Sequence, residues 1–274
     1  MTPASPVTRT ATRAVILAAG LGSRLRPLTL ERPKPLIEVH GIPILHNALR
    51  NLACVGVKEA TLVVGYRSEV IQRSCGHRFA GVDIHYAESS MFDRTGSAYS
   101  LWLARETLLS GSDVLLLEGD VFFEEEMLNR VLRPRGDVAA VAVFDETMTG
   151  SAVLLSGAER VGEFRMNQTA ANLSGPRLFK TVNIYRFTAE TLRTTLVPEL
   201  DSLIAAGNPK AYIEQFLAPL VTRQRLDLHA AVCDDVRWFE IDNESDLRIA
   251  EAIFRPEAQH AIPEVSPWTP APAV

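Results

Sequence analysis

Short apolar runs alternate with amphipathic stretches through the first half of the chain. Four runs are predicted to be strands and cover residues 14–18, 60–64, 82–86 and 113–118. Three stretches between them carry apolar residues at helical spacing and cover residues 43–54, 69–75 and 97–109. Strands that alternate with helices in this way predict βαβ units and a mostly parallel sheet.

The pattern changes after about residue 136. Further strands are predicted at residues 137–144, 181–187, 226–232 and 237–240, and a hairpin from residues 151–155 and 161–164. Further helices are predicted at residues 188–197, 211–223 and 243–254, the last with Asn243 as its N-cap. The pattern therefore predicts a single α/β domain with a mostly parallel central sheet flanked by helices, plus a smaller part built from a β-hairpin and helices.

Both ends of the chain differ from the rest. Residues 1–12 are rich in Thr, Ala and Pro and are predicted to be a disordered lead-in, and residues 256–274 carry five prolines and are predicted to be an extended or disordered tail. The start of the chain has no apolar core of a secretory signal, and no run approaches about eighteen apolar residues. We therefore expect no membrane partner and a cytoplasmic protein.

Composition narrows the function only slightly. Hydrophobic residues make up 47% of the chain and charged residues 22%, as in ordinary soluble domains. The net charge of −5 argues against a nucleic-acid partner. The three cysteines fit no metal-ligand spacing, and Cys54, in apolar surroundings, is predicted to be a buried thiol.

The first predicted strand ends in a glycine loop with cations. Gly20 and Gly22 allow close approach of the backbone to a ligand, and Arg24 and Lys34 follow, the lysine between two prolines. Exposed amides and cations of this kind predict a polyphosphate site. The loop is not a P-loop or a dinucleotide fingerprint, because Leu25 stands where the latter needs a third glycine. A simple strand-to-helix turn would leave the clustered cations unexplained.

Two carboxylates follow predicted strands far apart in the chain. Asp120 ends the run Asp113–Asp120, and Asp242 lies just before the last predicted helix. Ligands of open α/β sheets bind at the carboxyl ends of strands, and Mg²⁺ prefers one or two carboxylates plus substrate phosphates. Alternatively, Asp120 forms a turn and Asp242 favours a helix start. The orientation of Glu118 and Glu240 depends on strand register.

The string L-A-A-G-x-G-S-R-L over residues 17–25, with P-K-P-L at residues 33–36, resembles the nucleotidyltransferases of the sugar-phosphate nucleotidylyltransferase superfamily. The resemblance covers roughly residues 14–254. It implies a Rossmann-like domain whose substrate-binding part spans about residues 145–235.

The resemblance also implies roles for individual residues. Arg24 and Lys34 are expected to be catalytic, with Lys34 at the α-phosphate and Arg26 in support. Asp120 and Asp242 map onto the Mg²⁺ ligands of the family. Contacts to the nucleotide are expected from Leu17, Ala18, Ala19, Gly20, Gly22 and Ser23.

A second stretch indicates the branch of the superfamily. Residues 95–105, T-G-S-A-Y-S-L-W-L-A-R, are similar to the phosphocholine cytidylyltransferase branch, which includes phosphonate cytidylyltransferases. The resemblance favours CTP and implies nucleotide contacts from Glu88, Thr95 and Ser97. Gly96 and Ser97 depart from the asparagines frequent in that branch.

The acceptor is expected to be anionic. Lys180 enters a predicted buried strand, and period-two alternation places Asn183 on the same face as Thr181. Tyr212 and Glu214 are further acceptor candidates, and Arg165 and Arg177 precede Lys180 in a polar loop. Such a set suits a small phosphonate or a phosphocholine-like molecule, although no aromatic cage for choline is evident.

The sequence therefore predicts Mg²⁺-dependent transfer of CMP from CTP to such an acceptor, with release of pyrophosphate. A phosphonate oxygen is already ionised near neutral pH, so no general base is needed, and none of the six histidines has a catalytic pattern. One alternative is a hexose-1-phosphate nucleotidylyltransferase that uses UTP or dTTP. Another is a non-catalytic nucleotide-binding regulatory protein, which the presence of Lys34, Asp120 and Asp242 disfavours. The sequence is also compatible with a homodimer.

Overall fold

The computed structural model describes residues 12–157 and 159–255. The predictions for residues 1–11 and 256–274 lie outside these ranges, and Thr12 already belongs to the first strand. The described strands of the central sheet are β1 (Thr12–Ala18), β4 (Glu59–Val64), β5 (Arg78–Phe79), β6 (Val82–Glu88), β7 (Asp113–Glu118), β9 (Asp137–Val143), β10 (Gly150–Ser156), β11 (Arg160–Gln168), β12 (Phe179–Phe187) and β13 (Leu228–Val232).

These strands form one ten-stranded sheet in the order β10-β11-β13-β9-β12-β7-β1-β4-β6-β5. Two small sheets accompany it, β2 (Glu38–Val39) with β3 (Ile42–Pro43), and β8 (Val121–Phe123) with β14 (Trp238–Glu240). The predicted single α/β domain and the predicted hairpin, now β10–β11, are confirmed.

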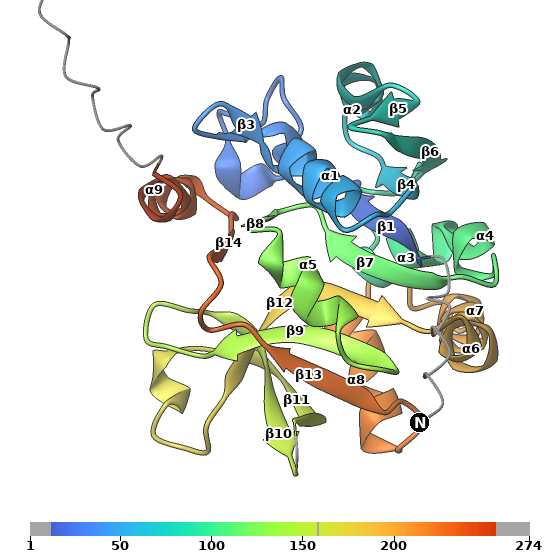
Figure 1. The fold of residues 1–274 in the computed structure, drawn as a ribbon, viewed down its shortest axis with the longest axis vertical. Coiled ribbons are helices and arrows are strands. Elements are labelled where there is room, and N and C mark those ends of the chain that lie inside the picture. The colour runs from blue at the N-terminus through green and yellow to red at the C-terminus, as the bar shows by residue number, and fades with distance from the viewer. Residues whose placement is uncertain (1–11, 158, 256–274) are drawn as a thin grey trace, which may run out of the picture.

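Helices cover both faces of the sheet (Figure 1). One face carries α1 (Ile44–Cys54), α2 (Ser68–Cys75) and α5 (Glu126–Leu132). The other carries α3 (Ser97–Leu103), α4 (Arg105–Leu108), α6 (Ala189–Thr191), α7 (Val197–Ala205) and α8 (Ile213–Thr222). The last helix, α9 (Glu244–Ile253), packs beside β14.

Parallel pairing is confined to part of the sheet. β6, β4, β1 and β7 are parallel neighbours, and β13 is parallel to β9. β12 pairs antiparallel with both β7 and β9, which corrects the expectation of a mostly parallel sheet for the second half. The connection between β9 and β12 explains this direction. The chain leaves β9, forms the β10–β11 hairpin and comes back beside β9 as β12 without a long crossover, which a parallel β12 would need.

Some predicted elements have different limits. The helix expected at residues 97–109 divides at Ala104 into α3 and α4. The helix expected at residues 188–197 continues through a π-helical turn into α7, with Pro198 tolerated in the first turn of α7. The short elements β8 and α5 were not predicted. Cys54 is exposed rather than buried, because it lies at the end of α1 where the helix leaves the core.

The two faces of the sheet form two apolar layers. Ile16 packs in the layer of α1, whereas Val15 and Leu17 pack in the layer of α3 and α8. Because both faces are covered, β1 has a continuous apolar sequence instead of an alternating one. Among the described residues, no helix has the length and apolar character required to cross a membrane.

A third, smaller core positions the site. It joins Leu25 after the glycine loop, Ile37 after Lys34, Phe122 of β8 and Ile241 after β14. These residues come from segments far apart in the sequence. Their packing fixes the loop that carries Lys34 against the strand end that carries Asp242.

Candidate active site

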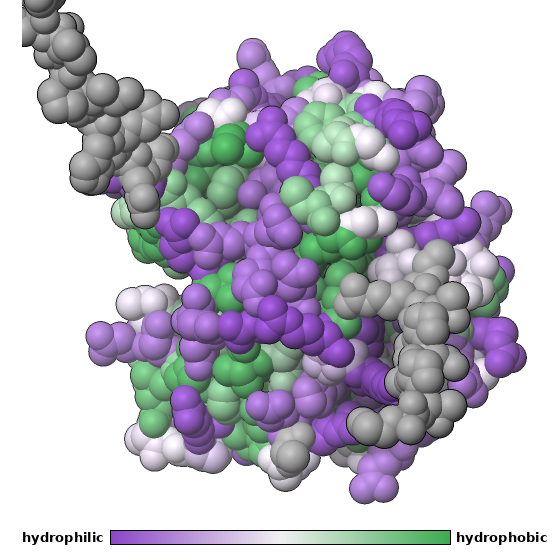
Figure 2. Space-filling model, viewed as in Figure 1, coloured by the Kyte–Doolittle hydropathy of each residue, from purple (hydrophilic) through white to green (hydrophobic). Residues whose placement is uncertain are grey.

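The carboxyl ends of β1 and β7 open into a cavity of about 670 Å³. Its walls include the glycine loop, the start of α8, one end of β12 and the turn after β14. Ligands of α/β sheets bind at this edge. Figure 2 shows a notch in the outline of the molecule on the side where α9 lies, between α9 and the strands below it.

The two glycines of the loop differ. Gly22 has a φ of +59°, and a Cβ there would lie 2.8 Å from Cβ of Lys34. Gly20 lines the cavity without a left-handed backbone, and a Cβ there would meet no atom within 4 Å. Only Gly22 therefore needs the conformational freedom that the sequence analysis assigned to both, while Gly20 leaves open space for a ligand.

Lys34 begins a short 3₁₀ turn between Pro33 and Pro35. Its Nζ donates to Oδ2 of Asp120 at 2.8 Å and to Oδ1 of Asp242 at 2.6 Å. Burial alone would lower the pKa of Lys34, but the two carboxylates outweigh it and raise the pKa. The ammonium is therefore charged at neutral pH and is held between the two predicted metal ligands.

Asp120, Glu240 and Asp242 form what we call the acid cluster, with one oxygen of each within 4.8 Å of the others. The β8–β14 pairing assembles it, because Glu240 pairs with Val121 and the Ile241 amide donates to the Asp120 carbonyl at 2.9 Å. Oδ1 of Asp120 is buried and has no hydrogen-bond partner among the described residues. Oxygen ligands and an orphaned oxygen suit a hard divalent cation.

Arg24 also reaches the cluster, with its Nη2 at 2.9 Å from Oδ1 of Asp242. Burial would raise the pKa of Asp242, but Lys34 and Arg24 hold it below its usual value. The structure thus brings together Arg24, Lys34, Asp120 and Asp242, which the sequence analysis selected. It adds Glu240, whose direction the sequence left open because the register of β14 was unknown.

A bulge in β12 shapes the opposite end of the cavity. Asn183 has a φ of +62°, and the pairing of β12 with β9 shifts between Thr181 and Tyr185. As a result, Lys180 and Asn183 both contact Glu240, Lys180 Nζ to Oε2 at 2.9 Å and Asn183 Nδ2 to Oε1 at 3.0 Å. Lys180 and Asn183 are three positions apart, so strict alternation would place them on opposite faces of β12. The register of β12 against β9 shifts by two residues between Thr181 and Tyr185, and this bulge lets both side chains reach Glu240.

Lys180 is deeply buried, and Glu240 is half-buried. Burial would lower the pKa of Lys180, but the Glu240 carboxylate raises it above its ordinary value. Burial raises the pKa of Glu240, and Lys180 opposes that rise. The pair is therefore a charged contact that links the predicted acceptor region to the acid cluster.

Glu214 and Glu118 add carboxylates to the same cavity. Glu214, in the first turn of α8, accepts a hydrogen bond from Oγ1 of Thr181 at 3.3 Å. Burial, and then Glu214, raise the pKa of Glu118 well above its ordinary value. Ser97 links α3 to α8, because its Oγ accepts a hydrogen bond from the Ile213 amide at 3.0 Å.

The other predicted residues fall in different places. Leu17, Ala18, Ala19, Ser23, Thr95 and Ser97 line the cavity with the glycines, and the 60% exposed Tyr212 lies at its rim. Glu88 does not line it, because its exposed side chain accepts from Ser68 at 3.1 Å.

The remaining arginines also lie outside the cavity lining. Arg26 is exposed, Arg165 pairs with Glu163 at 3.0 Å, and Arg177 lies over the ring of Phe179. Lining residues that the sequence analysis did not select include Phe92, Asp93, Gln215 and the residues in and beside the hairpin Thr149, Gly150, Ser151, Met166 and Asn167. The hairpin was predicted, but its uncharged residues gave no chemical signal.

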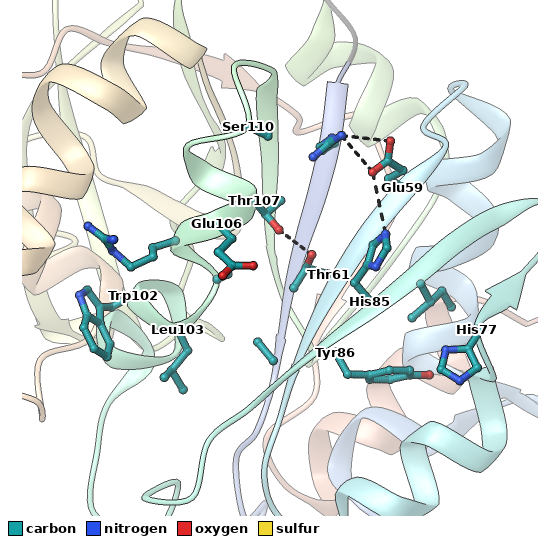
Figure 3. Close-up of a pocket in the computed structure, with 15 residues that line it drawn as sticks. Glu59, Thr61, His77, His85, Tyr86, Trp102, Leu103, Glu106, Thr107 and Ser110 are labelled. Atoms are coloured by element: carbon teal, nitrogen blue, oxygen red, sulfur yellow. Dashed lines mark hydrogen bonds and ion pairs between the residues drawn. The ribbon is translucent and has the colours of Figure 1, made fainter.

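A second cavity of about 1020 Å³ lies between β4, β6 and the α3–α4 helices (Figure 3). It is at the amino ends of β1 and β4, away from the edge where ligands of such sheets bind. Several of its charged groups already have partners: Arg13 lies 3.1 Å from Glu59, His85 lies 3.9 Å from the same carboxylate, and Arg105 lies 2.8 Å from Asp201. The first cavity is therefore the candidate active site.

Comparisons with known proteins show the family of the chain. Residues 13–149, half of the chain, match the family described as Nucleotidyl transferase. The chain is 35% identical over 246 residues to CMP-5'-(3-aminopropyl)phosphonate synthase of Streptomyces rubellomurinus, covering 89% of this chain but only 39% of that protein.

Two further proteins are similar over nearly their whole lengths. The chain is 24% identical over 253 residues to CTP:phosphoglutamine cytidylyltransferase of Campylobacter jejuni, covering 86% of this chain and 98% of that one. The solved structure of CTP:phosphocholine cytidylyltransferase from Streptococcus pneumoniae has a TM-score of 0.72 at 19% identity, covering 89% of this chain and 99% of that one. At this identity the likeness concerns the fold.

Proposed function

Because this chain belongs to the nucleotidyl transferase family, we propose that it transfers CMP from CTP to a small phosphonate or phosphocholine-like acceptor and releases pyrophosphate. The observation that carries the proposal is the convergence of Lys34, Asp120 and Asp242 at the end of the cavity next to the glycine loop. The choice of CTP is supported by the names of the relatives, two of which are a CMP-phosphonate synthase and a CTP-dependent cytidylyltransferase.

The acid cluster fits Mg²⁺ as a cofactor. Asp120 and Asp242 would hold the ion, with Glu240 close enough to contribute. When bound there, Mg²⁺ would neutralise charge on the triphosphate.

The cations and amides of the chain then bind the phosphates. Backbone amides around Gly20 and Gly22 bind triphosphate oxygens, and Arg24 adds a charged contact. Lys34 leaves the aspartates and stabilises the charge that develops at the α-phosphoryl group. An ionised oxygen of the acceptor attacks the α-phosphorus, and the bond from that phosphorus to the bridging oxygen of the β-phosphate breaks. No general base takes part, since the attacking oxygen carries no proton.

The acceptor occupies the opposite end of the cavity. Lys180 is buried there, and its charge attracts a phosphonate or phosphate anion toward the α-phosphorus. The hairpin β10–β11 closes this end of the cavity through Gly150, Ser151, Met166 and Asn167. Pyrophosphate then leaves on the side of the glycine loop.

Pyrophosphate release in the presence of Mg²⁺ tests the proposal. CTP, UTP, dTTP, ATP and GTP are each paired with 3-aminopropylphosphonate, other phosphonates, phosphocholine and hexose-1-phosphates. We expect turnover with CTP and a phosphonate or phosphocholine. Turnover confined to UTP or dTTP with a hexose-1-phosphate, or silence across the panel, would contradict the proposal. The Asp242→Asn variant controls for contaminating activity.

A further inference from the structure

The acceptor end of the cavity has more acidic than basic side chains. Lys180 is paired with Glu240, and the other two cations of the cavity contact the aspartates of the acid cluster. Glu214 is only 8% exposed, and within residues 12–157 and 159–255 no cation forms an ion pair with it. Its observed contact is the hydroxyl of Thr181. A buried carboxylate without a cation indicates that a ligand supplies one.

A second observation comes from a different element. Asn183 of β12 is 4% exposed and lines the cavity. Its Nδ2 donates to Glu240, which fixes the orientation of the amide, and its Oδ1 is buried with no hydrogen-bond partner in the part of the chain that the structure describes. An amide oxygen accepts hydrogen bonds only, so the missing partner is a donor. Asn183 lies two positions after Thr181, the partner of Glu214, on β12, and both Asn183 and Glu214 line the cavity, so the two groups lie at the β12 end of it.

We propose that the acceptor is a zwitterion, an aminoalkyl phosphonate or phosphate ester whose ammonium group is bound by Glu214 and by Oδ1 of Asn183. This inference rests on the proposed function and assigns the two ends of its acceptor. The anionic group faces Lys180, and the ammonium group faces Glu214 and Asn183. In this position the ammonium group donates a hydrogen bond to Oδ1 of Asn183 and neutralises the charge of the Glu214 carboxylate.

A primary ammonium fits better than a quaternary one. Three N–H donors suit a carboxylate and an amide oxygen, whereas a quaternary nitrogen has no donor and is bound by several aromatic faces. The described cavity lining contains two aromatic residues, Phe92 and Tyr212, and Tyr212 is 60% exposed. The chemistry of the cavity therefore favours hydrogen-bonded recognition of an amine.

The first test uses the unaltered protein with Mg²⁺, saturating CTP and two matched acceptors, 3-aminopropylphosphonate and propylphosphonate. We expect kcat/KM to be higher for the amine by about 10- to 100-fold, the range of a charged hydrogen bond. Turnover with equal kcat/KM for both would overturn the ammonium site and leave the proposed function standing. Turnover with neither would overturn both.

The second test assigns the residue. Glu214→Gln keeps the shape of the side chain and an acceptor for Thr181, so folding is expected to persist. For 3-aminopropylphosphonate we expect KM to rise about 10- to 100-fold with little change in kcat. For propylphosphonate we expect KM within about twofold of the unaltered protein. Glu190→Gln, also in the first turn of a helix but outside the cavity, is the matched control.

An equal loss on both acceptors in Glu214→Gln would show a structural role and overturn the assignment. A thermal melt of each variant measures folding directly. If Glu214→Gln does not fold, Asn183→Gly provides the alternative: glycine suits the positive φ and removes the proposed acceptor oxygen, so the preference for the amine over propylphosphonate should decrease. An unchanged or higher preference would count against the site.

Discussion

At the scale of single residues, Gly20 and Gly22 serve the same loop for different reasons. Gly22 lies in a left-handed conformation against the Lys34 side chain, so a methyl group there disturbs the lysine. Gly20 borders open cavity space, so a methyl group there disturbs only a ligand. The sequence alone shows two glycines and cannot separate these roles, because neither backbone angles nor distant neighbours are visible in it.

Alanine at these positions should separate folding from binding. Gly22→Ala forces a positive φ on a residue with a Cβ, which costs about 1–2 kcal/mol, and displaces Lys34. We expect a lower melting temperature and a lower kcat. Gly20→Ala should keep the melting temperature and raise KM for the nucleotide. Calorimetry and steady-state kinetics on both variants measure this, and equal melting temperatures for the two would contradict the structural role of Gly22.

Lys34 is the residue on which turnover should depend most. Lys34→Ala removes the cation that we propose stabilises the reacting phosphate, and we expect kcat to fall by about 10²–10³-fold or more. Circular dichroism should show an intact fold. The exposed Lys58→Ala is the matched control and should retain its activity. Near-normal kcat in Lys34→Ala would refute the assignment.

At the scale of elements, short pairings decide what the active site contains. The three-residue strands β8 and β14 join Asp120 to Asp242, and a single bulge directs Asn183 toward Glu240. Long regular elements such as residues 14–18 were predicted from periodicity because burial on both faces leaves a continuous apolar run. The bulge and the β8–β14 register depend on tertiary pairing, so periodicity carried no signal for them.

The N-cap of α9 was predicted correctly and can be measured. Oδ1 of Asn243 accepts from the amides of Ser245 at 2.8 Å and of Asp246 at 3.1 Å. Asn243→Ala should lower the free energy of unfolding by about 1 kcal/mol, because two amides lose their acceptor. Urea denaturation measures it, with the exposed Ser245→Ala as control. A loss no larger than in the control would show that the cap contributes little.

His46 connects α1 with α2 and β5 and should make stability depend on pH. Its Nε2 lies 2.9 Å from Oγ of Ser74, and its ring lies 4.4 Å from that of Phe79. Burial, and then Arg50, lower the pKa of His46 below 6.5. The unfolded chain therefore takes up this proton at a higher pH than the folded protein. Stability is fully present above pH 6.5 and falls as pH drops toward the lowered pKa.

We therefore expect the melting temperature of the unaltered protein to fall between pH 7 and pH 5.5 by more than that of His46→Gln. Glutamine can keep a hydrogen bond to Ser74 without the ring's titration. Melts at several pH values in matched ionic strength measure the difference. Parallel pH profiles for the two proteins would exclude His46 as the cause.

At the scale of the whole molecule, the site joins segments that only the complete fold brings together. Lys34, Asp120 and Asp242 span most of the domain. The two aspartates were expected to meet because each follows a predicted strand, although β14 belongs to the small sheet with β8 and not to the central sheet. The acceptor end was predicted less completely, since the hairpin residues there contribute shape and not charge. Charged residues with a chemical role can be recognised in a sequence. Cavity walls formed by the backbone and by small uncharged side chains cannot.

The position of Lys34 between two aspartates predicts how ligands affect global stability. Mg²⁺ alone should leave the melting temperature nearly unchanged, because the carboxylates already have a counter-charge. Mg²⁺ with CTP should raise it, since the triphosphate offers the ammonium a new partner. Scanning calorimetry with each ligand alone and with both measures this. A large shift with Mg²⁺ alone would contradict the expectation.

The same contact imposes an order on events during a catalytic cycle. A lysine that already holds both aspartates competes with an incoming ion, so cation and nucleotide are expected to arrive as one complex. The lysine then transfers from the protein's own carboxylates to the substrate, and it returns when pyrophosphate departs. On this proposal Lys34 occupies the place of the divalent ion in the resting protein, and the affinity for free divalent ions is set by how firmly this side chain is held between the two aspartates.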